Sequence, residues 1–164
     1  GYEGYLNDRV VTMPQLLKAA GYHTYMVGKW HMGKAPDQIP AARGFERDFS
    51  LLDGAGSYWD MTNFTAASPK SVFTEDGRYL TKLPDDYYAT KTYTDKLIDY
   101  LQNSKKDGKP FFAYAAYTAP HWPLQAPKAY LDCASPQPGG HRVLVPARLP
   151  ADSPTVRCIQ KQTD

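Results

Sequence analysis

Residues 21–31 read GYHTYMVGKWH. Residues 22–27 are β-branched and aromatic in character, which is typical of a strand. The predicted strand leads into Gly28 and Lys29, and His31 follows two residues later. Because ligands of open α/β sheets bind outside the carboxyl ends of strands, this stretch predicts a binding loop directly after a strand.

A helix is predicted just before this strand. Thr12 is the expected N-cap, Pro14 lies in the first turn, and Gln15 completes a capping box. Apolar side chains then recur at helical spacing on one face, at Met13, Leu16, Leu17 and Ala20. Gly21 supplies the left-handed residue that ends the helix, so the predicted order is helix, turn and strand.

A second helix and strand follow the same order later in the chain. The helix is predicted over residues 88–103, with one apolar face formed by Ala89, Tyr93, Leu97, Tyr100 and Leu101. Residues 111–117 form a continuous apolar run, the pattern of a strand buried on both faces. His121 follows this strand, so a second histidine is expected at the same edge of the sheet.

The segment between these two units has weaker signals. Residues 43–45 read as a turn, and residues 49–52 predict a short strand. The loop that follows contains Ser57, and it is either a substrate loop or a flexible turn anchored by two aromatic residues. Residues 60–87 read as a long insertion with few structural signals.

Three side chains carry the predicted chemistry. The Lys29 ammonium with the imidazoles of His31 and His121 suits an anionic substrate and proton transfer to or from it. Prolines on either side stiffen the backbone around His121, which fits a catalytic role or a structural proline loop. No activated nucleophile and no carboxylate cluster for a metal accompany the set.

Nucleotide binding is a competing interpretation. Residues 28–34 match the spacing of a phosphate loop and follow a predicted strand. However, Ala35 stands where a hydroxyl would bind Mg²⁺, and the bulky Trp30 and His31 occupy the loop that would wrap the phosphates. These departures argue against nucleotide binding.

Composition limits the range of partners. The net charge is +2, and residues 133–164 hold four Lys or Arg against two Asp, which leaves 15 basic and 15 acidic residues in 1–132. The basic balance therefore belongs to the tail and predicts no nucleic-acid binding. The chain has no apolar run of about 18 residues, so no membrane span is expected. No signal peptide is visible, and periplasmic, secreted and cytoplasmic locations all stay open.

The chain changes character near residue 132. All 22 aromatic residues lie in 1–132, and the tail is rich in proline and glycine. We expect residues 133–164 to be disordered or loosely attached, as a natural linker or as an artefact of the gene model. Cys133 and Cys158 both lie in this tail, and their spacing fits no zinc pattern.

The motifs resemble those of a known family. Residues 21–33 closely resemble the second signature of sulfatases, and residues 7–17 and 119–127 are similar to bacterial-type arylsulfatases. The resemblance runs from about Gly1 to Asp132. It implies an α/β fold that is part of the alkaline-phosphatase-like (sulfatase) fold, with a mixed central sheet flanked by helices.

The resemblance also implies a reaction, the hydrolysis of sulfate monoesters of small molecules or carbohydrates. In the family a formylglycine attacks sulfur and a calcium ion polarises the sulfate. Lys29 would then contact the sulfate and the oxygen of the nucleophile, and His31 would hold the nucleophile. His121 would stabilise sulfate or protonate the leaving oxygen, and Ser57 would supply a hydroxyl beside the sulfate.

The sequence also departs from the family. No C-x-P-x-R motif, the source of formylglycine, precedes Tyr22, and the calcium ligands of the family are missing. We therefore expect an internal piece of a sulfatase that is inactive by itself. Two alternatives stay open: a phosphate or phosphonate monoester hydrolase of the same superfamily, and a truncated product without function.

Overall fold

The computed structural model describes residues 3–64, 68–128 and 130. The chain divides into two compact units, Gly1–Leu124 and Gln125–Asp164, and every named helix and strand lies in the first unit. The predicted tail, residues 133–164 with both cysteines, lies outside the described residues. Its separation from residues 1–132 therefore stays a prediction.

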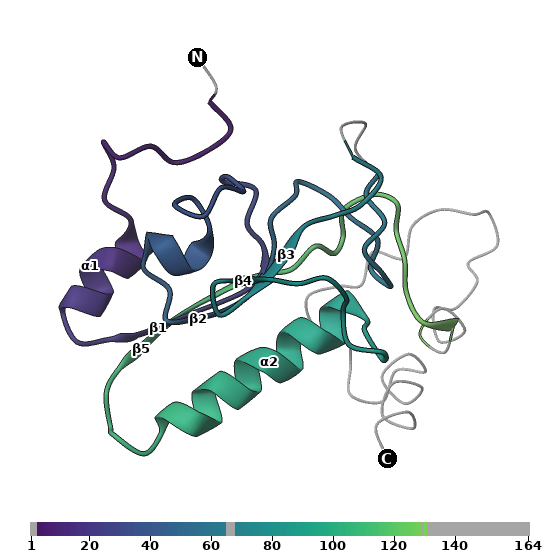
Figure 1. Cartoon of the computed structure of the whole chain (residues 1–164). Coiled ribbons are helices and arrows are strands. Elements are labelled where there is room, and N and C mark those ends of the chain that lie inside the picture. The colour runs from purple at the N-terminus through teal and green to yellow at the C-terminus, as the bar shows by residue number, and fades with distance from the viewer. Residues whose placement is uncertain (1–2, 65–67, 129, 131–164) are drawn as a thin grey trace, which may run out of the picture. The chain divides into compact units, whose positions relative to one another are not determined.

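A mixed sheet of five strands organises the first unit (Figure 1). Its strands stand in the order β4-β3-β2-β1-β5. The strands are β1 (His23–Lys29), β2 (Arg47–Leu51), β3 (Phe73–Glu75), β4 (Arg78–Tyr79) and β5 (Phe111–Ala116). Strand β1 runs parallel to both β2 and β5, whereas the β2–β3 and β3–β4 pairs are antiparallel. The expected α/β fold with a mixed sheet is confirmed.

Helices cover both faces of this sheet. Figure 1 shows α2 (Ala89–Ser104) on one side, and α1 (Met13–Ala19) with the short 3₁₀ helix η1 (Pro40–Arg43) on the other. Tyr93 and Tyr100 of α2 are buried in one apolar cluster with Tyr25 and Val27 of β1. Met26, which points to the opposite face of β1, lies in a second cluster. The predicted apolar face of the second helix is confirmed.

Helix α1 begins as its sequence predicts. The Thr12 side chain accepts a hydrogen bond from the Gln15 backbone N–H, and the Gln15 side chain accepts one from the Thr12 N–H at 2.8 Å. The capping box is thus confirmed. The predicted apolar face of α1 is only partly buried, because Met13 and Leu16 are 60% and 61% exposed.

Two sequence predictions, one on residues 60–87 and one on residues 111–117, were wrong. Residues 60–87 are not only an insertion, since they contain β3 and β4, joined by a tight turn at Asp76 and Gly77 with φ of 48° and 78°. An Asp-Gly pair is a hairpin signal, but strands of three and two residues are too short to show a period.

The second error concerns residues 111–117. Strand β5 was expected to be buried on both faces, but in the described part of the chain it is an edge strand. Phe111 is 53% exposed and Tyr114 is 42% exposed. The segment is apolar, as predicted. However, an apolar composition does not determine how many strands lie beside β5.

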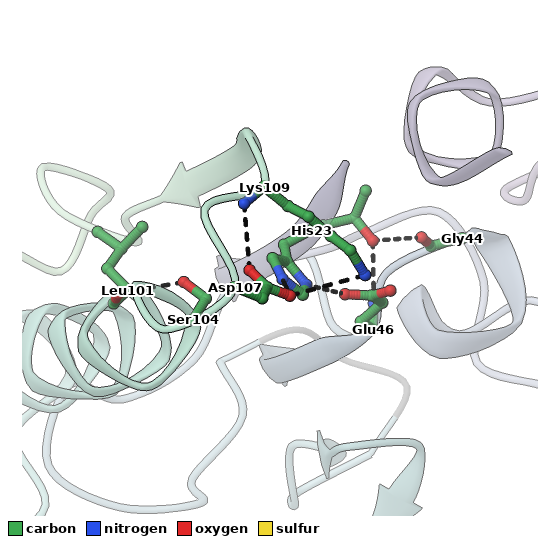
Figure 2. A network of polar contacts seen from close by, with 8 residues as sticks. His23, Gly44, Glu46, Leu101, Ser104, Asp107 and Lys109 are labelled. Atoms are coloured by element: carbon green, nitrogen blue, oxygen red, sulfur yellow. Dashed lines mark hydrogen bonds and ion pairs between the residues drawn. The ribbon is translucent and has the colours of Figure 1, made fainter. Parts of the chain in front are cut away.

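A charge network closes the amino end of β1 (Figure 2). The His23 ring bridges two carboxylates, with Nδ1 2.9 Å from Glu46 Oε2 and Nε2 2.8 Å from Asp107 Oδ2. Since an ionised carboxylate only accepts, both ring nitrogens carry hydrogen when both bonds form. The bond to Glu46, followed by the bond to Asp107, raises the pKa of His23. The network ties the loop after α2 and the residue before β2 to β1.

Candidate functional site

The predicted site residues lie at, or follow, the carboxyl ends of three parallel strands. Strands β2 and β5 flank β1 in parallel, with Lys29 opposite Leu51 and Gly28 opposite Ala116. The loops that leave the carboxyl ends of these three strands therefore start side by side. Lys29 is the last residue of β1, and the three loops carry His31, Ser57 and His121 in chain order.

Lys29 is a half-buried cation at the end of β1. Its ammonium makes no hydrogen bond or ion pair with any residue in the described ranges 3–64 and 68–128. The neighbouring Gly28 has a φ of +101°, and a Cβ there would lie 2.0 Å from the Ala116 carbonyl oxygen. Only glycine allows this close approach of β1 to β5, which holds the backbone beside Lys29 in place.

The indole of Trp30 fixes the other side of Lys29. It is buried, and its Nε1–H donates to the Gln38 carbonyl at 2.8 Å. Its backbone N–H donates to the Leu51 carbonyl at 2.7 Å. Lys29 is therefore held between two anchored residues while its own side chain stays without a partner among the described residues.

His31 adopts a left-handed backbone with a φ of 53°. Such a conformation is uncommon for a residue with a Cβ, and strain of this kind clusters at functional sites. The ring packs on Gly54, where an added Cβ would lie 2.5 Å from His31 Cε1. Otherwise His31 is exposed, and its ring forms no hydrogen bond within the described part of the chain.

His121 is exposed and held from two sides. Its Nδ1 lies 2.6 Å from the Trp122 carbonyl oxygen, so Nδ1 carries the hydrogen of this bond and Nε2 is left for a substrate. The buried Tyr58 donates its hydroxyl to the His121 carbonyl at 2.7 Å and lies 3.3 Å from the Thr118 carbonyl. Burial raises the pKa of Tyr58, which keeps this donor protonated.

Ser57 lies in the same region, but its hydroxyl is used within its own turn. The Ser57 Oγ accepts from the Trp59 N–H at 3.2 Å, and the Ser57 N–H donates to the Thr62 carbonyl at 2.8 Å. The Thr62 N–H, and more weakly the Ser57 hydroxyl, lower the pKa of Asp60. Of the two interpretations left open for this loop, the geometry favours the anchored turn.

The loop from Asp53 to Tyr58 contains the site residues that sequence reasoning missed. Gly54 supports the His31 ring, and Tyr58 holds the His121 backbone. Asp53 has a nearly buried side chain that accepts from the Val72 N–H at 2.7 Å and pairs with the Lys34 ammonium. Its position just past a predicted strand was a signal that could have singled it out.

The nucleotide-binding alternative lacks its structural context. A phosphate loop leads directly into the first turn of a helix, whose N–H groups face the phosphates. After Lys34 the chain turns, and the next helix is the 3₁₀ helix that begins at Pro40. The Lys34 ammonium is also paired with Asp53.

The described residues do not fit a calcium ion. Within them, no group of three or more His, Cys, Asp or Glu side chains is arranged to hold a metal. Asp53 is a buried acid in this region, but its oxygens already accept from Val72, Asn63 and Lys34. No step of the reaction is therefore assigned to calcium.

No helix in the described ranges is long and apolar enough to cross a membrane.

Comparisons with known proteins agree on one family. The family model described as Sulfatase matches residues 2–140. An uncharacterized sulfatase of Schizosaccharomyces pombe is 44% identical over 138 residues, which cover 80% of this chain and 25% of the relative. The arylsulfatase of Klebsiella aerogenes is 39% identical over 133 residues, which cover 80% of this chain and 28% of that enzyme.

A solved structure shows the same fold. The structure of BT4656 in complex with its substrate D-glucosamine-2-N,6-O-disulfate has a TM-score of 0.58 and 31% identity, covering 85% of this chain and 25% of that one. The chain thus spans about a quarter of the length of the curated relatives it matches. On the family match, the identities and the shared fold together, the chain belongs to the sulfatase family.

Proposed function

We propose that this chain supplies the sulfate-binding and proton-transfer side chains of an enzyme that hydrolyses sulfate monoesters. The observation that carries the proposal is Lys29, a half-buried residue whose ammonium has no partner among the described residues. Partial burial of an unpaired charge is unfavourable, and a bound anion would compensate it. The site lies where three parallel strand ends meet, which is the expected place for a ligand in such a sheet.

Lys29 binds the sulfate in this proposal. An ammonium offers three N–H donors to the sulfate oxygens and stabilises the charge that develops on them during ester cleavage. Gly28 and Trp30 fix the backbone on both sides, so the backbone that carries the cation is in place before substrate arrives. Such preorganisation makes an electrostatic contribution to catalysis effective.

His121 exchanges the proton with the leaving oxygen. Its Nδ1–H is committed to the Trp122 carbonyl, so Nε2 is the atom that faces a substrate. In the imidazolium form Nε2–H donates to the ester oxygen as the bond to sulfur breaks. His31 is the second imidazole, held against Gly54, and we assign it proton transfer on the nucleophile side.

Ser57 has an indirect part in this proposal. It lies between Gly54, which supports His31, and Tyr58, which holds the His121 backbone. Its hydroxyl keeps the turn folded through the Trp59 N–H. We therefore assign Ser57 to positioning the loop, whereas sulfate contact is assigned to Lys29.

Sulfatases in general depend on formylglycine and calcium. The nucleophile would supply the covalent step and the metal would polarise the sulfate, and the described residues hold neither. The proposal gives this chain only binding, orientation and proton transfer. The relatives include an N-acetylglucosamine-6-O-sulfatase of Bacteroides thetaiotaomicron, so we propose a sulfated sugar as the substrate.

The proposal is tested by titrating the chain with inorganic sulfate in a calorimeter. Lys29→Met is expected to weaken sulfate binding by roughly tenfold or more, because an ion pair near a protein surface is worth a few kcal/mol before desolvation. Lys82→Met is the matched control, since it removes an equal charge from an exposed pair with Asp85. Equal losses in both variants, or none in Lys29→Met, would reject the proposal.

A further inference from the structure

The loop that carries His31 has an unfavourable backbone conformation. His31 has a φ of 53°, and Gly33, two positions later, has a φ of +115°. Because His31 carries a Cβ, its left-handed backbone costs free energy and persists only where other contacts hold it. The position of the His31 ring on Gly54 therefore depends on contacts that keep this loop in place.

Lys34, three residues after His31, ties the loop to its surroundings. Its backbone is fixed on β4, because the Tyr79 hydroxyl donates to the Lys34 carbonyl at 2.6 Å. Its ammonium pairs with the carboxylate of Asp53. Since Asp53 directly precedes Gly54, this ion pair joins the loop of His31 to the loop on which the ring packs.

Asp53 is itself firmly held. Its side chain is 4% exposed, and it accepts from the Val72 N–H at 2.7 Å and from the Asn63 side-chain amide at 3.0 Å. Val72 directly precedes β3, so the carboxylate is bonded to the sheet as well as to Lys34. A buried carboxylate of this kind needs hydrogen-bond donors and a cation to balance its charge. Asp53 is therefore a fixed point to which the mobile end of Lys34 is attached.

We propose that Lys34 and Asp53 are positioning residues that keep the His31 ring on Gly54. The proposal rests on the proposed function, which gives His31 a part in proton transfer. An acid or base must lie within hydrogen-bond reach of the atom that it serves, so a displaced loop would lose this role. Lys34 differs from Lys29 in that its charge is already paired, and no sulfate contact is assigned to it.

The test observes the contact between the His31 ring and Gly54 by NMR in the full chain. An added Cβ at Gly54 would lie 2.5 Å from His31 Cε1, so the His31 Hε1 proton should give an NOE to the Gly54 Hα protons. Lys34→Met should lose this NOE, whereas Lys34→Arg, which keeps a cation for Asp53, should retain it. The Lys34 side chain is 47% exposed, so we expect both variants to fold.

Lys96→Met is the matched control. Lys96 of α2 pairs with Glu75 of β3, and its side chain is 31% exposed, so an ammonium is again removed from a partly buried ion pair. The NOE between His31 and Gly54 should remain in this variant. Thermal unfolding of both methionine variants shows whether an NOE is lost with the contact alone or with the whole fold.

Titration with inorganic sulfate separates this proposal from the proposed function. Lys34→Met should change the sulfate affinity by less than about twofold, because a paired and partly exposed charge has little effect beyond its partner. If sulfate binding does not depend on Lys29, the proposed function is rejected, whereas the NOE still reports on the position of His31.

Three results would overturn the positioning role. The first is the absence of the NOE in the unaltered chain, and the second is its retention in Lys34→Met or its equal loss in Lys96→Met. The third is a loss of sulfate affinity in Lys34→Met as large as that in Lys29→Met, which would make Lys34 a sulfate ligand.

Discussion

The two ends of β1 use charge in opposite ways. At the amino end, His23 is bonded to Glu46 and Asp107, so a cation and two carboxylates satisfy one another (Figure 2). At the carboxyl end, Lys29 has no hydrogen bond or ion pair among the described residues. One strand thus joins a region built for stability to a region that is left open for an anion.

The difference follows from what each end must do. Paired charges close to the backbone hold loops together, and removing one partner leaves the others unsatisfied. An unpaired cation at a site contributes nothing to folding until its ligand binds, when the gain appears as added stability. Substitutions at the two ends should therefore separate stability from binding.

Alanine substitution of one glycine near each end of β1 should lower stability by very different amounts. Gly28→Ala places a Cβ 2.0 Å from the Ala116 carbonyl oxygen at a φ of +101°. We expect a loss of roughly 3 kcal/mol or more in the free energy of unfolding, because strain and a backbone clash combine. Urea unfolding followed by circular dichroism measures it.

Gly108→Ala is the matched control at the amino end. Gly108 has a φ of +67°, but a Cβ there meets nothing within 4 Å. Its expected cost is about 1 kcal/mol, from the left-handed backbone alone. Similar losses for the two variants would mean that the β1–β5 approach at Gly28 is not tight.

The stability contributed by the charge network at the amino end of β1 should depend on pH. The pKa of His23 is raised, so its contribution is complete below its ordinary value of 6.5 and is lost as pH rises through the folded value. The pKa of Asp107 is lowered, first by the Lys109 backbone N–H and then by His23. Its contribution is complete above 3.8 and is lost as pH falls through the folded value. The network therefore contributes most to the free energy of unfolding between pH 3.8 and pH 6.5, the ordinary pKa values of Asp107 and His23.

His23→Leu should remove this contribution. At pH 5.5 we expect the variant to be less stable by about 1–2 kcal/mol, a typical value for charged hydrogen bonds. The difference from the unaltered chain should narrow as pH rises to 9. Thermal unfolding across this range measures it, and Lys82→Leu, which breaks an exposed pair, should show no such trend. A constant difference would show that His23 acts by packing on Tyr25 rather than by charge.

Sequence patterns predicted the parts of the fold that depend on local order. The strand over residues 22–27 and the helix over 88–103 have a clear composition or period, and Thr12 with Gln15 is a local capping signal. The edge position of β5 could not be predicted, because it depends on which strands lie beside it in space. Short strands such as β4 also escape any period.

For the candidate site, too, the sequence predicts positions along the chain but does not predict contacts between distant segments. The rule for parallel strand ends was enough to place Lys29 and His121 at one edge. The supporting contacts were not predictable, because Tyr58 reaches His121 across 63 positions of the chain. The support of the His31 ring by Gly54 likewise depends on how two separate loops pack. Such contacts follow from the fold and leave no local pattern.

The carboxyl end of β1 should tolerate the loss of its cation. Lys29→Met removes a charge that no described residue pairs with, so no polar group is left behind, and the change in stability without sulfate should stay within about 0.5 kcal/mol. Added sulfate should then stabilise the unaltered chain more than the variant, since only the ligand-bound state gains from the ammonium. Urea unfolding with and without sulfate measures both quantities. A loss above about 1 kcal/mol without sulfate would contradict the argument, because Lys29 would then hold the fold together as His23 does.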